Sequence, residues 1–229
     1  MKFRYVWFDL GLTLVRSPFE ELYNQVLAAF DVQKEEDEIK RAFYLTDKEF
    51  MRNYPHVLGT LPAHFMPWYL GLLNYKLGLR LNIEETYRIY TKLKEGLSLK
   101  WRLIPGVAEM LKELRQRGVH IGLITNWDAS CRSVLNANNL DSWLDITVIS
   151  SEVGIEKPEK AIFQMALDEA GAEAEEVLYV GDNYYDDVVG AGQAGIRSLL
   201  IAPYGRLGIE EINHEYIISN IKEVADYLE

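Results

Sequence analysis

The chain has 229 residues, of which 48% are hydrophobic and 26% charged, and its formal net charge is −11. This length and composition fit one large soluble domain, or a core with a smaller second domain. The acidic balance argues against broad nucleic-acid binding, which needs a basic surface, but it leaves room for a locally positive cleft that takes a small anion.

The first expected element is a strand over residues 3–8, a nearly continuous apolar run that ends at Asp9. Such runs are typical of strands buried on both faces, as in a parallel sheet. The next segment has helical apolar spacing instead. We expect helices there, with Ser17 as the N-cap of the first, at residues 17–30, 34–50, 62–79 and 82–97.

After Trp101, strands and helices alternate along the chain. We expect helices at 106–117, 129–138, 158–171, 185–194 and 221–228, and strands at 119–125, 145–150, 176–182, 196–201 and 216–219. This alternation predicts an α/β fold with a doubly wound, Rossmann-like parallel sheet. The helical segment then becomes an insertion, so we expect an α/β core of residues 1–15 and 100–229 and a helical domain of residues 16–99.

Polar side chains interrupt the pattern where the expected strands end. Asp9 follows the first strand, Thr125 and Asn126 follow the strand that ends near them, Asp182 ends another, and Lys157 lies in a loop before a helix. Ligands of open α/β sheets bind beyond the carboxyl ends of the strands. A carboxylate nucleophile, a carboxylate-bound Mg²⁺ and donors for phosphate oxygens would together support phosphoryl chemistry.

Each of these signals is weak alone, because a lone acid after a strand is more often a turn or helix cap. In order, however, they resemble the four motifs of the haloacid dehalogenase-like hydrolase superfamily: DLGLT from Asp9, TN from Thr125, the Lys157-Pro pair, and GDNYYDD around Asp182. The resemblance covers the expected core. The inserted segment resembles the helical cap that many members carry after the first motif.

The resemblance implies roles in phosphate transfer. Asp9 would be the nucleophile that becomes phosphorylated. Thr125, Asn126 and Lys157 would hold the phosphate, so that Lys157 also counts as catalytic. The implied substrate is a small phosphorylated metabolite whose identity the sequence leaves open.

The resemblance also implies a Mg²⁺ site. Asp9 and Asp182 would bind the ion together with the main-chain carbonyl of Gly11. A further acid would support it, with Asp187 a better match to the family than Asp186.

Gly11 departs from the family pattern. Phosphatases of this superfamily usually have a second aspartate there, which protonates the leaving oxygen and later activates water. A glycine can do neither, although it can adopt a positive φ if the turn requires one. His56, His64 and Asp128 are candidates for the missing role and we assign none of them. We expect His64 to be packed within its aromatic helix.

Two alternatives to a phosphatase remain. A dehalogenase would suit Gly11, because halide leaves without a proton, but it has no use for Asp182. A phosphate-binding regulatory protein that has lost turnover is the other. Aromatic residues that could line a substrate pocket, although such residues are more often core, are Trp127, Tyr54, Phe65, Trp68 and Tyr69.

Cellular location follows from cysteine content and hydropathy. Cys131 is the single cysteine, so no internal disulfide can form, which indicates a reducing compartment. We see neither a signal peptide nor a membrane-length apolar run, and therefore expect a cytoplasmic protein without a membrane partner. The oligomeric state is left open.

Overall fold

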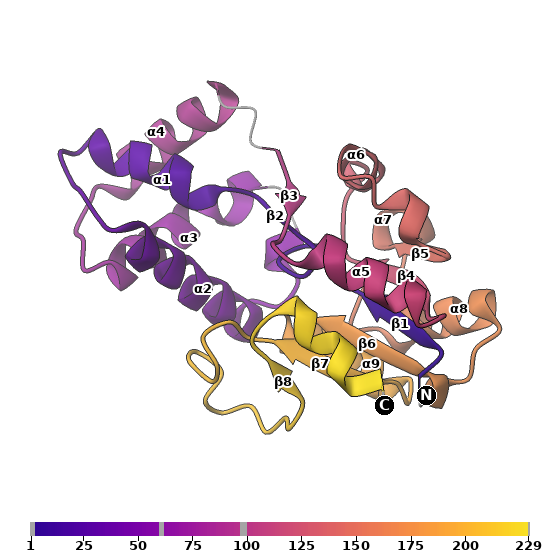
Figure 1. Ribbon diagram of the computed structural model, residues 1–229. Helices are drawn as coiled ribbons and strands as arrows, with labels where there is room; N and C mark the ends of the chain where they lie inside the picture. Colours follow the sequence, from indigo (N-terminus) through magenta and orange to yellow (C-terminus); the bar gives the residue numbers. More distant parts are fainter. Residues whose placement is uncertain (1–2, 60–61, 97–99, 229) are drawn as a thin grey trace. The chain divides into compact units, whose positions relative to one another are not determined.

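The apolar run near the N-terminus folds into β1, Tyr5–Phe8, at the centre of a six-stranded sheet in the computed structural model (Figure 1). The structure describes residues 3–59, 62–96 and 100–228. It divides into a core unit, Met1–Arg16 with Trp101–Glu229, and a helical unit, Ser17–Lys100.

The sheet of the core unit has the order β5-β4-β1-β6-β7-β8, and every neighbouring pair is parallel. The remaining strands are β4 His120–Thr125, β5 Ile146–Ile149, β6 Val177–Gly181, β7 Arg197–Ile201 and β8 Ile217–Ile218. From β1 the chain adds strands on one side and then returns to add strands on the other. The predicted doubly wound parallel sheet is therefore confirmed, with its switch point around β1.

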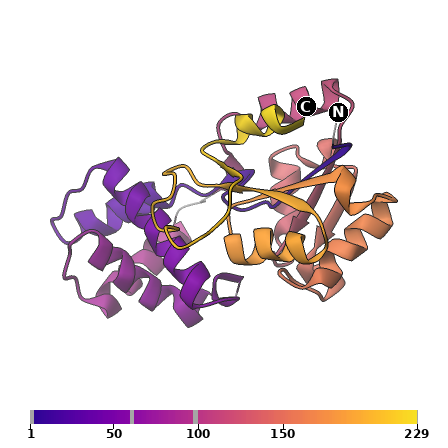
Figure 2. The same cartoon turned by 90° about the horizontal axis from the view of Figure 1, so that it is seen from below.

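Helices cover both faces of this sheet (Figure 2). On one face lie α5 Val107–Gln116, α6 Cys131–Ala137 and the 3-10 helix Ile221–Leu228. On the other lie α8 Lys160–Ala170 and α9 Val189–Gln193. Shorter helical turns are α7 Ser150–Val153, Asp141–Trp143 and Ala174–Glu176.

Two of the expected helices form with a geometry other than a plain α-helix. The segment expected as a helix at 185–194 begins with a π-helical turn, Tyr184–Val188, before α9. The last helix is 3-10 rather than α. A π-turn widens the helix by one residue, so period-based reasoning from the sequence does not detect it.

The core unit also contains a small antiparallel pair, β2 Val15–Arg16 with β3 Arg102–Leu103. The pair joins the chain where it leaves the core unit and where it returns. Two residues per strand are too few to show an alternating pattern, so the sequence analysis missed it.

In the helical unit, each expected helical stretch forms a helix. These are α1 Phe19–Ala28, α2 Glu36–Asn53, α3 Pro62–Lys76 and α4 Ile83–Gly96, with a short 3-10 turn at Val57–Gly59. Helix α1 packs against α2 and α4, and α3 packs against the same two. The expected N-cap Ser17 was wrong by one residue, because Pro18 holds that position.

The core of the helical unit combines aliphatic residues with several aromatic ones, including Phe65 and Tyr69. The hydroxyl of Tyr69 donates to Asp47 at 2.6 Å. By contrast Trp68 is 63% exposed and Tyr54 44% exposed. His64 is exposed as well, which corrects the expectation that it is packed. On α3, His64 lies outside the apolar face that carries the buried aromatic residues.

None of the helices in the described ranges combines the length and apolar character that crossing a membrane requires.

Candidate active site

Asp9 lies one residue beyond the buried end of β1. Phe8 is fully buried and aligned with Leu123 of β4 and Val180 of β6, so the next residue emerges at the middle of the sheet's carboxyl edge. The Asp9 amide still donates to the Val180 carbonyl at 2.9 Å. The side chain of Asp9 is 12% exposed and is held by its neighbours rather than by solvent.

Two donors fix the Asp9 carboxylate. Its Oδ1 accepts from Lys157 Nζ at 2.8 Å and from Thr125 Oγ1 at 3.1 Å. Thr125 ends β4, the strand next to β1, and Lys157 comes from the loop before α8. Three segments that are far apart in the sequence thus meet at one oxygen atom.

Lys157 is buried, with 3% of its side chain exposed, and its ammonium has three acceptors. Nζ donates to Asp9 Oδ1 at 2.8 Å, to Asp187 Oδ1 at 2.6 Å and to the Tyr179 hydroxyl at 3.1 Å. An ammonium carries three N–H groups, so its donors are matched to these acceptors. Its orientation is therefore set by the protein.

Tyr179 also belongs to the site, although the sequence did not predict it. This residue lies inside β6, is fully buried, and its hydroxyl donates to the Ile124 carbonyl at 2.8 Å while accepting from Lys157. A phenol in an otherwise aliphatic strand, three residues before Asp182, was the available signal. It was read only as part of an apolar run.

Asn126 holds the loop that carries Lys157. Its Nδ2 donates to the Lys157 carbonyl at 2.9 Å, and its Oδ1 accepts from the Lys157 amide at 2.8 Å. In the structure the side-chain amide of Asn126 thus contacts the main chain of Lys157, and its binding to phosphate stays a prediction.

Asp187 rather than Asp186 joins the buried cluster. Asp187 is 1% exposed and its Oδ2 accepts from the Asn183 amide at 2.9 Å. Asp186 accepts from the side-chain amide of Asn183 at 2.7 Å. A Cβ added to Gly181 would lie 2.2 Å from Asp187 Oδ2, so glycine is needed there for the close approach of this carboxylate.

The carboxylates of Asp9, Asp182 and Asp187 gather within 4.8 Å of one another, and all three residues are buried. Lys157 is the cation paired with two of them. When all these groups are ionised, the cluster has two more negative charges than positive ones. Carboxylate oxygens are the ligands that hard divalent cations such as Mg²⁺ prefer. The donor type and the excess charge both fit such an ion.

The cluster shifts the pKa of its members. Burial raises the pKa of Asp9 to about 6, the charge of Lys157 works against this rise, and the carboxylates of Asp187 and Asp182 add to it. Burial alone would lower the pKa of Lys157, but the Asp187 and Asp9 carboxylates hold it well above its usual value. Near neutral pH, a charged lysine therefore faces a largely ionised Asp9.

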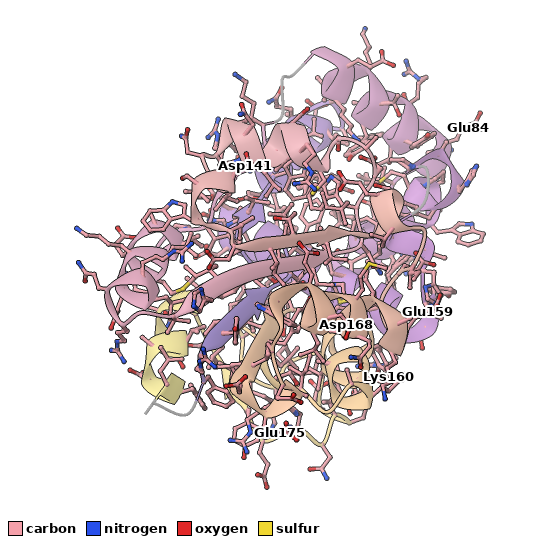
Figure 3. The ribbon with its side chains drawn as sticks, turned by 90° about the vertical axis from the view of Figure 1, so that its right-hand side faces the viewer. Glu84, Asp141, Glu159, Lys160, Asp168 and Glu175 are labelled. Carbon is pink, nitrogen blue, oxygen red and sulfur yellow. The ribbon has the colours of Figure 1, made fainter. Side chains whose placement is uncertain are left out.

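This cluster is unlike the acidic residues of the surface. Several charged side chains stand out into solvent (Figure 3), namely Glu84, Asp141, Glu159, Lys160, Asp168 and Glu175. Surface charges of this kind contribute solubility, whereas buried carboxylates need compensation by partners. The carboxylates at the sheet edge therefore differ from the surface charges in being buried and held by partners.

Gly11 lies in the loop after Asp9 and forms a bridge with Val15. The residue with a left-handed backbone in this loop is Leu12, with φ of 55°, so the positive φ considered for Gly11 falls on its neighbour. The three other candidates for a proton donor lie exposed: His56, His64 and Asp128.

With this fold and site established, comparison with known proteins identifies the family. The model of the haloacid dehalogenase-like hydrolase family matches residues 6–201, and the chain belongs to that family. The protein is a hydrolase.

The chain is also similar to individual relatives and to solved structures. The chain is 27% identical over 241 residues to the rhythmically expressed gene 2 protein of Drosophila melanogaster, covering 98% of this chain and 90% of the relative. It is 34% identical over 127 residues to pyrimidine 5'-nucleotidase YjjG of Escherichia coli, covering 55% of this chain and 56% of the relative. A magnesium-bound structure of the HAD-hydrolase YfnB from Bacillus subtilis has a TM-score of 0.66 at 19% identity, covering 100% and 99% of the two chains.

Proposed function

We propose that this hydrolase is a Mg²⁺-dependent phosphatase that acts on a small phosphorylated metabolite through a phosphorylated Asp9. The observation that carries the proposal is the buried cluster at the sheet edge, where Lys157 pairs with two of three gathered carboxylates. The name of the relative YjjG, a pyrimidine 5'-nucleotidase, supports phosphate-ester hydrolysis. The helical unit is proposed to serve as the cap that selects the substrate.

The chain's own residues would carry the reaction as follows. Asp9 attacks phosphorus, the bond to the leaving oxygen breaks, and the electron pair leaves with that oxygen. Lys157 offsets the charge of the phosphoryl oxygens, and Thr125 fixes the attacking carboxylate. Water then cleaves the aspartyl phosphate, which releases inorganic phosphate and restores Asp9.

Asp9 and Asp182, with the main-chain carbonyl of Gly11, would hold Mg²⁺, and Asp187 would support it. When bound, the ion would offset the excess negative charge of the cluster and polarise the phosphoryl group. The hydrogen bonds of Asp9 support these roles, because Lys157 and Thr125 both donate to the same carboxylate oxygen, Oδ1.

The test is phosphate release from p-nitrophenyl phosphate with Mg²⁺ and with EDTA, for the wild type and Asp9→Asn. The control is Asp168→Asn, an exposed aspartate on α8. Activity should require Mg²⁺ and should be lost only in the Asp9 variant. Halide release from a 2-haloacid without Mg²⁺ would favour the dehalogenase instead. Phosphate binding without turnover would favour the regulatory protein.

A further inference from the structure

The space beside Gly11 is filled by an aromatic side chain. A Cβ added to Gly11 would lie 3.2 Å from Cζ3 of Trp127 and 4.0 Å from its Cη2. Because the left-handed residue of this loop is Leu12, the backbone does not need glycine at position 11. The neighbouring indole therefore explains the glycine better than turn geometry does.

Trp127 is held in this position from three directions. Its Nε1 donates to Ser130 Oγ at 3.0 Å, and its amide donates to Ser150 Oγ at 3.1 Å. Its ring meets Trp101 edge-to-face, with centroids 4.8 Å apart. It follows Thr125 by two residues, in the loop beyond β4, and part of its surface is exposed. The indole is thus a fixed, partly open surface beside Gly11, which follows Asp9 by two residues.

The buried donors nearest to Asp9 in the described core unit are already engaged with protein acceptors. Lys157 Nζ donates to Asp9, Asp187 and the Tyr179 hydroxyl, and the Tyr179 hydroxyl donates to the Ile124 carbonyl. Hydrogen bonds from Ser130 lower the pKa of Asp128, so this neighbour of Trp127 is ionised. A leaving oxygen would therefore depart without help from these side chains.

We propose that Trp127 is a specificity-determining residue and that the site selects phosphate monoesters with a flat, weakly basic leaving group, an aryl or enol oxygen. This rests on the proposed phosphatase function. Asp9 forms its bond to phosphorus as the ester P–O bond breaks. The electron pair of that bond stays on the leaving oxygen, whose negative charge is stabilised by the π-system of the leaving group. That oxyanion needs no proton in this step and takes one from water afterwards. The partly exposed indole packs against the flat group.

Leaving-group dependence is the first test. With Mg²⁺, the wild type should hydrolyse p-nitrophenyl phosphate faster than phenyl phosphate, and both faster than an alkyl phosphate. The difference in kcat between aryl and alkyl esters should approach the roughly 10²–10⁴-fold that general acid catalysis typically supplies. Equal rates for the two classes would overturn the proposal.

Trp127→Ala should raise KM for the aryl esters by roughly 2- to 10-fold, the range of aromatic contacts, and leave KM for the alkyl ester unchanged. Trp127→Phe should largely restore the aryl KM. The matched control is Trp143→Ala, a partly buried tryptophan in the turn before β5. An equal rise for both substrate classes, or a rise in the control alone, would contradict the role of Trp127.

Binding without turnover separates this inference from the function on which it rests. In calorimetry with Mg²⁺, phenylphosphonate should bind more tightly than methylphosphonate, and Trp127→Ala should remove the difference. If esters are hydrolysed but the two phosphonates bind the wild type equally, the aromatic preference is wrong and the phosphatase stands. If no ester is hydrolysed but the preference persists, the phosphatase proposal fails alone. If neither occurs, both fail.

Discussion

Replacing Lys157 by methionine removes the cation at the centre of the site and keeps a side chain of similar length. In the native protein, Nζ lies 2.8 Å from Asp9 Oδ1 and 2.6 Å from Asp187 Oδ1, and 3% of the side chain is exposed. The variant leaves both carboxylates buried without their partner. Breaking a buried ion pair in this way typically costs about 3–5 kcal/mol of stability.

The loss should depend on pH. Without the ammonium, the folded-state pKa of Asp9, already raised to about 6 by burial, rises further, while the unfolded value stays near 4. The folded variant then binds more protons than the unfolded chain between these values, so its stability increases as the pH falls. The deficit relative to the wild type should therefore be smaller at pH 5.5 than at pH 7.5.

Urea denaturation of the metal-free protein at both pH values measures this effect, with Lys160→Met as the control. Lys160 lies three residues further on and is exposed at the start of α8 (Figure 3). Its loss should change the free energy of unfolding by less than about 0.5 kcal/mol. The reasoning is refuted if Lys157→Met is as stable as the control, or if its deficit is the same at both pH values.

Three further predictions concern the same cluster. Mg²⁺ affinity should fall as the pH drops below about 6, because burial raises the pKa of Asp9 to that value and a protonated carboxyl must lose its proton to bind; calorimetry in two buffers of different ionisation heat should show the proton release. Asp187→Asn should weaken Mg²⁺ binding by about 10–100-fold and Asp186→Asn by much less, with equal losses contradicting the assignment. Tyr179→Phe removes an acceptor of the Lys157 ammonium and should lower the free energy of unfolding by about 1–3 kcal/mol, measured in urea; an unchanged value would show that the hydroxyl contributes nothing.

Much of the fold could be predicted from the sequence because its elements have strong local patterns. Strand β1 is a continuous apolar run, and α5 ends where Gly118 takes a positive φ of 75°. What the sequence left out depends on tertiary contacts. The pairing of Val15–Arg16 with Arg102–Leu103 joins segments on either side of the insertion, and no local sequence pattern predicts it.

The residues of the site fall into the same two groups, those that sequence patterns identify and those whose contacts depend on the tertiary fold. Asp9 and Asp182 could be named from the sequence because each belongs to an ordered set of motifs, although either acid alone would be a weak signal. The hydrogen bonds of Asn126 and Tyr179 could not be predicted, because their shared partner Lys157 lies 31 and 22 positions away from them in the chain. A sequence motif records which side chains are present, but the partner of each is set by strand order and loop path.

Because of the contacts of Lys157, the geometry of the site also depends on the folding of the whole core unit. The ammonium joins Asp9, 148 positions earlier, to Asp187, 30 positions later, and Asn126 holds the main chain of the same residue. These four residues come from four different segments. Asp9 follows β1, Asp187 lies in the π-helical turn, Asn126 lies in the loop after β4, and Lys157 lies in the loop before α8. A partial assembly would bury carboxylates without their cation, which is costly. The site therefore favours a core unit in which these segments are either all in place or not yet packed together.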